Sequence, residues 1–227
     1  DLEQRKLIAN IRVGGAPGLA RVSPDGKTVV ASNRADGTIS IIDTAKLAVR
    51  ATVAVCDKPE DLAILPDSSK VFVACTGSSA VAAVDLKNDR LLTLLEVGKT
   101  PVQLAMKPDG GEIYVCNFDS SSVSVIETTT NEIGPTFLIG TNPAHAIVSA
   151  DNTMLYVSNF GSNAVSVYEI DIGKVLGALP TGASPEALAL TGNQKFLLVA
   201  DTLSGDVAVL RLEKMPGAPK ISAERAL

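Results

Sequence analysis

Five prolines recur at a constant spacing along this chain: Pro17, Pro59, Pro101, Pro143 and Pro185 are each 42 residues apart. Other columns keep the same register without an insertion or deletion. Eight residues after each proline come Asp25, Asp67, Asp109, Asp151 and Asn193, and sixteen residues after it come Asn33, Cys75, Asn117, Asn159 and Asp201. A period of this length, kept over five copies, predicts that the chain folds as five repeats of one structural unit.

Each repeat has the pattern of four short strands. In the third repeat, apolar or alternating segments at 103–106, 112–117, 122–127 and 133–139 are separated by turn-forming clusters such as Lys107-Pro108-Asp109-Gly110-Gly111. The period of two excludes helical repeats, whose apolar residues recur every three to four positions. Four strands in 42 residues are typical of a propeller blade. The predicted fold class is therefore all-β, a β-propeller of four-stranded antiparallel blades.

The fifth repeat supplies only three strand-like segments, because the place of its fourth strand contains Pro216 and Pro219. Residues 7–13 align with 49–55, the fourth strand of the first full repeat. We therefore expect this N-terminal strand to complete the last blade and to remove its open edge. A single propeller domain would span residues 1–213, and residues 214–227 would be a tail or a linker. The ring is either a closed five-bladed propeller or part of a larger one.

Charge and cysteine content exclude several classes of protein. The net charge of −5 argues against nucleic-acid binding, which needs a basic stripe to displace counterions. No apolar stretch approaches the ~18 residues that indicate a membrane-spanning helix. Three cysteines without a C-x-x-C pair and a single histidine give no ligand set for a metal, so no metal and no cofactor are expected.

The second and third strands of the repeats carry a recognisable signature. It is clearest in residues 156–167, Tyr-Val-Ser-Asn-Phe-Gly-Ser-Asn-Ala-Val-Ser-Val, and it recurs in Tyr114-Val115-Cys116-Asn117. These segments resemble the YVTN-type propeller family, and the likeness covers nearly all of residues 7–213. That family occurs in bacterial and archaeal surface-layer, periplasmic and secreted proteins and usually has seven blades. The resemblance implies an extracytoplasmic propeller but no catalytic motif, because the signature residues build the blades.

The resemblance also bears on the cysteines. Cys56 precedes the first strand of its blade and Cys75 ends the second, so both should lie on the same face. Under the oxidising conditions that this family usually meets, the two would form a disulfide if their Cα atoms lie within ~7 Å. The alternative is that all three cysteines, Cys116 included, are small, partly buried thiols.

Candidate site residues are expected where loops surround the mouth of the central channel. In propellers, the fourth-to-first and second-to-third connections lie on that face, and residues there that differ between repeats are the better functional candidates. The six candidates are Asp57, Asp61, Lys99, Gln103, His145 and Glu186. Three of them, Asp61, Gln103 and His145, share one position in consecutive repeats and would jointly hold a polar ligand. The alternative is a solvated rim.

Three functions remain open at this point. The first is a non-enzymatic, extracytoplasmic scaffold that binds a protein, a glycan or another cell-envelope partner through its loop face. The second is a propeller enzyme or cofactor-binding subunit of the lactonase, lyase or dehydrogenase kind, with a site at the central channel. The third is a periplasmic DNA-binding propeller, which the acidic net charge disfavours. The single histidine and the lack of a catalytic constellation favour the first function over the second.

Overall fold

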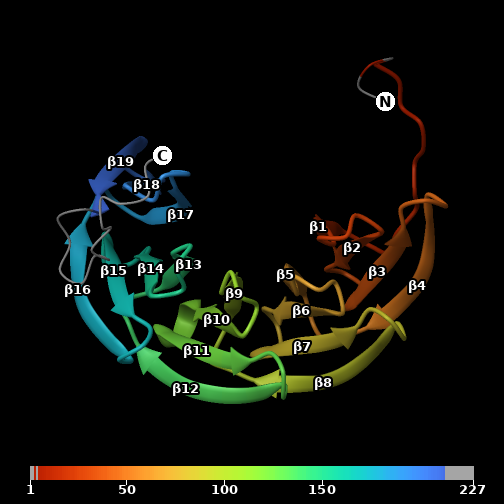
Figure 1. The fold of residues 1–227 in the computed structure, drawn as a ribbon, viewed down its shortest axis with the longest axis horizontal. Helices are drawn as coiled ribbons and strands as arrows, with labels where there is room; N and C mark the ends of the chain where they lie inside the picture. The colour runs from red at the N-terminus through yellow and green to blue at the C-terminus, as the bar shows by residue number, and fades with distance from the viewer. Residues whose placement is uncertain (1–2, 4, 213–227) are drawn as a thin grey trace, which may run out of the picture.

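The computed structural model describes residue 3 and residues 5–212, and this part of the chain contains nineteen β-strands in five sheets (Figure 1). The first blade consists of β1 (Pro17–Val22), β2 (Thr28–Asn33), β3 (Thr38–Asp43) and β4 (Ala48–Ala54). The second consists of β5 (Pro59–Ile64), β6 (Lys70–Cys75), β7 (Ala80–Asp85) and β8 (Arg90–Glu96). The third consists of β9 (Pro101–Met106), β10 (Glu112–Asn117), β11 (Ser122–Glu127) and β12 (Glu132–Leu138). The fourth consists of β13 (Pro143–Val148), β14 (Met154–Asn159), β15 (Ala164–Glu169) and β16 (Lys174–Pro180), and the fifth of β17 (Pro185–Leu190), β18 (Phe196–Asp201) and β19 (Asp206–Arg211).

Each blade is an antiparallel meander in which consecutive strands pair, in the order β1-β2-β3-β4 for the first. Figure 1 shows the five sheets fanned around a common centre, with the first strand of each sheet innermost and, in the four complete blades, the fourth strand outermost. The predicted all-β propeller class is confirmed. In the third blade, β10 and β11 have the bounds that the alternation predicted, and β9 begins earlier, at Pro101.

The turns of every blade use left-handed residues at fixed places. Between the first and second strands these are Gly26, Ser68, Gly110, Asn152 and Gln194. Between the second and third strands they are Gly37, Ser79, Ser121, Asn163 and Gly205, and between the third and fourth they are Leu47, Asp89, Asn131 and Gly173. Most are glycine, asparagine, aspartate or serine, which favour turns or tolerate this conformation, so the recurring turn clusters set the repeat geometry.

The core consists of four apolar clusters, one between each pair of neighbouring blades. In the first cluster, Ile39 and Ile41 of β3 lie together with Val71 and Val73 of β6, and all four side chains are fully buried. In the second, third and fourth blades, the second and third strands have a neighbouring blade on each side, and both of their faces are therefore largely buried. Stability therefore depends chiefly on packing between successive blades.

A polar contact fastens the loop before the first blade to the end of the second strand of that blade. In the first blade, the backbone N–H of Gly14 donates to Asn33 Oδ1 over 3.1 Å, and Asn33 Nδ2 donates to Thr38 and Ser40 of β3. In the second blade the two equivalent positions are Cys56 and Cys75, which form a disulfide with a Cα–Cα distance of 5.8 Å. The disulfide thus replaces the glycine–asparagine contact, whereas Cys116 is a free, buried thiol.

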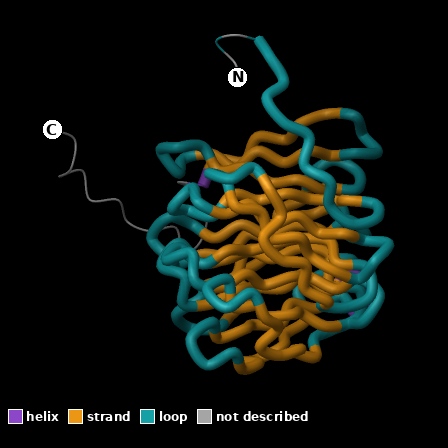
Figure 2. The backbone as a smooth tube through the Cα atoms, turned by 90° about the vertical axis from the view of Figure 1, so that its right-hand side faces the viewer, coloured by secondary structure: helices purple, strands orange, loops and turns teal. Residues whose placement is uncertain are grey.

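The closure of the ring differs from the expectation. Residues 7–13 belong to no strand, and the fifth sheet has only β17, β18 and β19, so the N-terminal segment does not complete the last blade. The five blades form an open arc whose first and last blades face each other across an opening (Figure 1), and the N-terminal segment extends away from the strands (Figure 2). Five blades at this curvature do not bring the two ends together. The tail expected at 214–227 lies outside the described residues, among which no helix is long and apolar enough to cross a membrane.

Candidate functional site

A pocket of about 930 Å³ opens where the innermost strands of the blades come together. Ten of the residues that line it come from two positions of the repeat. The residues directly after the prolines are Gly18, Glu60, Val102, Ala144 and Glu186, and the residues after these are Leu19, Asp61, Gln103, His145 and Ala187. We call this cavity the hub pocket.

The local backbone explains why two consecutive residues of each blade line the hub pocket. The residue before each proline is left-handed, with φ between 50° and 55°, at Ala16, Lys58, Thr100, Asn142 and Ser184. The strand pairing then shifts its register just after the proline, for example between Pro59 and Leu62. A bulge of this kind turns a strand and re-aims its side chains. Both residues of the bulge are thereby placed at the hub.

Side chains of the bulge also join one blade to the next. Asp61 is buried; its Oδ2 accepts from the backbone N–H of Leu104 in the third blade, and its Oδ1 accepts from Arg21 Nη2 in the first. Gln103 Oε1 accepts from the backbone N–H of Ala146 in the fourth blade over 2.9 Å. Asp61 and Gln103 are therefore fixed by the scaffold, which pre-organises this side of the hub pocket.

His145 occupies the same position in the fourth blade, but its imidazole does not make the corresponding hydrogen bond to the next blade. Its Nδ1 atom is buried and makes no hydrogen bond with the described residues. Burial lowers the pKa of His145 below its usual 6.5, although the carboxylate of Asp61 acts in the opposite direction. The imidazole is therefore neutral at pH 7 and offers one donor and one acceptor.

The charged groups of the hub pocket are largely paired with each other. Arg21 Nη2 lies 3.0 Å from Asp61 Oδ1, and Arg34 Nε lies 2.9 Å from Glu60 Oε2, so both arginines join the first blade to the second. Glu186 accepts a hydrogen bond from the Thr202 hydroxyl. On the side of the third and fourth blades, the rings of Phe118 and Phe160 pack against each other with centroids 5.9 Å apart. The hub pocket therefore combines paired charges with one aromatic wall.

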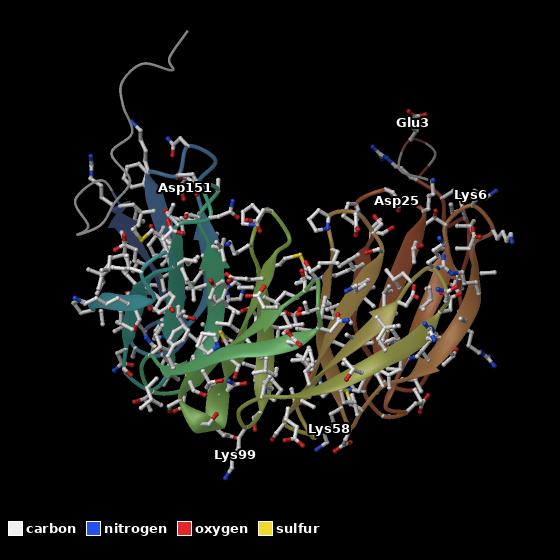
Figure 3. All side chains as sticks on the ribbon, turned by 60° about the horizontal axis from the view of Figure 1, so that its bottom comes forward. Glu3, Lys6, Asp25, Lys58, Lys99 and Asp151 are labelled. Carbon is white, nitrogen blue, oxygen red and sulfur yellow. A yellow bond between two sulfur atoms is a disulfide. The ribbon has the colours of Figure 1, made fainter. Side chains whose placement is uncertain are left out.

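The structure brings four of the six predicted site residues together in the hub pocket, namely Asp61, Gln103, His145 and Glu186. Asp57 and Lys99 do not line it and are exposed. Both precede the left-handed residue, so their side chains lie on the outer side of the turn; Figure 3 shows Lys99 pointing outward at the loop edge. No group of three or more histidine, cysteine or acidic side chains in the described part of the chain is arranged to hold a metal.

Sequence reasoning missed the aromatic wall and the two arginines. Phe118 and Phe160 share a position, seventeen residues after the proline, with Arg34 and Thr76, and all four line the hub pocket. The residue type at this position differs between repeats, and this variation is the signal by which the sequence could have identified the position. Arg21 was hidden because the equivalent residues of the other blades are apolar: Ala63, Ala105, Ile147 and Ala189.

Comparison with known proteins identifies a family and several structural neighbours. The model of the family described as YNCE-like beta-propeller matches residues 4–218. This match supports the prediction that the chain belongs to a β-propeller family. The narrower prediction, the YVTN-type family, is not confirmed by it. No curated protein matches the chain.

Solved structures resemble the chain in fold. Hydrazine synthase of Kuenenia stuttgartiensis is 22% identical with a TM-score of 0.72, over 91% of this chain and 70% of that chain. A candidate 6-phosphogluconolactonase from Bacteroides uniformis is 19% identical with a TM-score of 0.75, over 91% and 69% of the two chains. A second candidate 6-phosphogluconolactonase, from Bacteroides fragilis, is 20% identical with a TM-score of 0.74, over 90% of this chain and 68% of that chain. At these identities the likeness shows the fold alone.

Proposed function

Since this chain belongs to the YNCE-like beta-propeller family, we propose that it is an extracytoplasmic binding propeller whose hub pocket holds part of a glycan. One observation carries the proposal: both bulge residues of all five blades line a single cavity of about 930 Å³. A concave site with a few convergent polar groups is the usual form of a small-ligand site.

The chemistry of the hub pocket favours a neutral, polyhydroxylated ligand. The carboxylates of Glu60 and Asp61 are neutralised by arginines, and the imidazole of His145 is uncharged at pH 7. The pocket therefore offers donors and acceptors together, which match hydroxyl groups because each hydroxyl both donates and accepts. The rings of Phe118 and Phe160 supply an apolar surface for the C–H face of a sugar.

The Cys56–Cys75 disulfide supports an extracytoplasmic location, because structural disulfides persist mainly in oxidising compartments. A glycan of the cell envelope is a partner found in such a location. The remaining loop residues around the hub pocket, which include the exposed Asp57 and Lys99, are then available to a protein partner.

A second candidate function is catalysis at the same cavity, in keeping with the enzymes named among the structural neighbours. The specific observation in its favour is the neutral imidazole of His145, whose Nδ1 atom has no hydrogen-bond partner within the described part of the chain. A neutral histidine is suited to accept a proton from a hydroxyl or a water. This function predicts turnover of a lactone such as 6-phosphogluconolactone that disappears in His145→Ala.

Glycan binding can be measured by isothermal titration with cellobiose, maltose and N,N′-diacetylchitobiose. We expect the unmodified chain to bind at least one of them and Phe118→Ala to weaken that binding about tenfold, because removing one stacking ring costs ~1.4 kcal/mol of binding free energy. Gln194→Ala, a turn residue outside the hub pocket, is the matched control and should bind as the unmodified chain does. Absence of binding for all three disaccharides, or equal weakening in both variants, would refute the glycan proposal.

A further inference from the structure

The two rings of the aromatic wall come from turns of different blades. Phe118 follows β10 in the third blade and Phe160 follows β14 in the fourth, and both are partly buried at the hub pocket. Their ring centroids lie 5.9 Å apart, with an angle of 53° between the ring planes. Every strand ladder among the described residues stays within one blade. The relative position of the two rings therefore depends on contacts between the turns themselves.

The turn that carries Phe118 differs from its counterparts. In the first, second and fourth blades, a backbone hydrogen bond from the nineteenth residue after the proline to the sixteenth closes this turn. These bonds join Asp36 to Asn33, Ser78 to Cys75 and Ser162 to Asn159. In the third blade a short 3₁₀ helix, η1 (Phe118–Ser120), takes this place, and the N–H of Ser121 donates to the Phe118 carbonyl over 3.4 Å. A bond of that length is weak, so the carbonyl retains the capacity for a second donor.

Asn142 of the fourth blade supplies that second donor. Its side-chain Nδ2 donates to the Phe118 carbonyl over 3.0 Å, and its backbone N–H donates to Ser121 Oγ over 3.3 Å. Its own backbone carbonyl accepts from the N–H of Phe160 over 2.9 Å. Asn142 is therefore bonded to the backbone of both residues whose rings form the aromatic wall.

The backbone conformation does not by itself require asparagine at this position. The residue before the proline is left-handed in every blade, and the other four residues are Ala16, Lys58, Thr100 and Ser184. The backbone carbonyl of each accepts the hydrogen bond that corresponds to the one from Phe160, and the donors are Arg34, Thr76, Phe118 and Thr202. What Asn142 adds is the side-chain bond to the Phe118 carbonyl in the preceding blade.

Gly161 provides the space for the Asn142 amide. A Cβ atom at residue 161 would lie 2.6 Å from Asn142 Oδ1, so a larger residue there would displace the amide. The equivalent residues of the first, third and fifth blades are Ala35, Asp119 and Leu203. The repeat itself therefore does not demand glycine at this place, whereas the position of the Asn142 amide does.

We propose that Asn142 is the positioning residue of the aromatic wall, because its amide ties the turn of Phe118 to the turn of Phe160 and thereby sets the ring geometry that a sugar contacts. This role rests on the glycan site proposed above and explains how that site is pre-organised. A binding surface held by supporting hydrogen bonds loses less affinity to ordering when the ligand arrives. Removal of the amide should therefore weaken binding through the rings, although Asn142 does not itself line the hub pocket.

The ring geometry can be tested without any sugar. Asn142→Gly removes the amide and keeps a left-handed backbone, which glycine adopts readily. Lys58→Gly makes the same change at the equivalent, exposed position of the second blade and is the matched control. Nuclear Overhauser contacts between the Phe118 and Phe160 rings are measured in a chain labelled at its five phenylalanines. We expect these contacts in the unmodified chain and in Lys58→Gly, and we expect their loss in Asn142→Gly. Ring contacts that persist in Asn142→Gly, or that are absent from the unmodified chain, would overturn the proposal.

Isothermal titration with the disaccharide that binds the unmodified chain measures the consequence for affinity. We expect Asn142→Gly to bind about fivefold more weakly, the effect of losing one hydrogen bond, and Lys58→Gly to bind normally. Asn142→Asp keeps the side-chain shape but replaces the donor with an oxygen, so it should lose the ring contacts and weaken binding at least as much, even if glycine unfolds the chain. Unchanged affinity in both Asn142 variants, or equal weakening in Lys58→Gly, would contradict the positioning role. If the unmodified chain binds no disaccharide, the glycan proposal fails, and the ring contacts measured without sugar still decide the role of Asn142.

Discussion

Replacing Phe72 with alanine is expected to lower the free energy of unfolding by about 3–5 kcal/mol, the range for large aromatic truncations in a core. Phe72 lies in β6, is fully buried, and belongs to the cluster between the second and third blades together with Leu104 and Ile113. Because blades are stabilised chiefly by their neighbours, a cavity here weakens two blades at once.

Urea unfolding followed by circular dichroism measures this destabilisation. Leu94→Ala is the control, because Leu94 in β8 of the same blade is 49% exposed and its truncation should cost much less. Equal destabilisation by Phe72→Ala and Leu94→Ala would contradict the assignment of the core to the space between the blades.

The second large effect is expected on reduction of the Cys56–Cys75 disulfide. The bond links residues nineteen apart, and a loop of that size corresponds to about 3 kcal/mol in the chain-entropy account. Reductant should therefore shift the urea midpoint of the unmodified chain downward. The variant with both Cys56→Ala and Cys75→Ala should already have the lower midpoint and should not respond to reductant, because Cys116 is a free thiol.

Introducing the polar contact of the first blade into the second blade tests whether a non-covalent contact at the place of the disulfide also stabilises the fold. Cys56→Gly with Cys75→Asn recreates the glycine–asparagine pair, and Ala80→Thr with Ala82→Ser supplies the hydroxyls that Asn33 contacts in the first blade. We expect this variant to be more stable than the double alanine variant and insensitive to reductant. If the variant is no more stable than the double alanine variant, the polar contact does not replace the disulfide at this place.

The blades could be predicted from the sequence because local signals agree with the fold. Strand alternation, turn residues and the 42-residue period all indicate the same unit, and β10 and β11 accordingly have the predicted bounds. The pairing of residues 7–13 with the last blade could not be settled in this way. The aligned pattern identifies a fourth strand, but the blade that receives it depends on the curvature of the whole arc, which no local signal encodes.

The candidate site was predicted in part for a similar reason. The column that contains Asp61, Gln103 and His145 follows the proline closely, and all three residues line the hub pocket. Asp57 and Lys99 lie only a few residues earlier, yet the left-handed residue between them and the proline turns them outward. Closeness to the proline in the sequence is therefore not enough to predict that a residue lines the hub pocket, because one backbone dihedral decides which side of the turn a side chain occupies.

The most direct test of the hub pocket uses His145, the single histidine of the chain, whose ring gives one set of signals in a ¹H–¹³C NMR spectrum. Because the imidazole is partly desolvated, we expect a titration midpoint below 6.5. We also expect the ring signals to move when the disaccharide that binds the unmodified chain is added, in proportion to the occupied fraction. A midpoint of 6.5 or higher, together with ring signals that stay in place at saturating disaccharide, would contradict the assignment of the hub pocket as a glycan site.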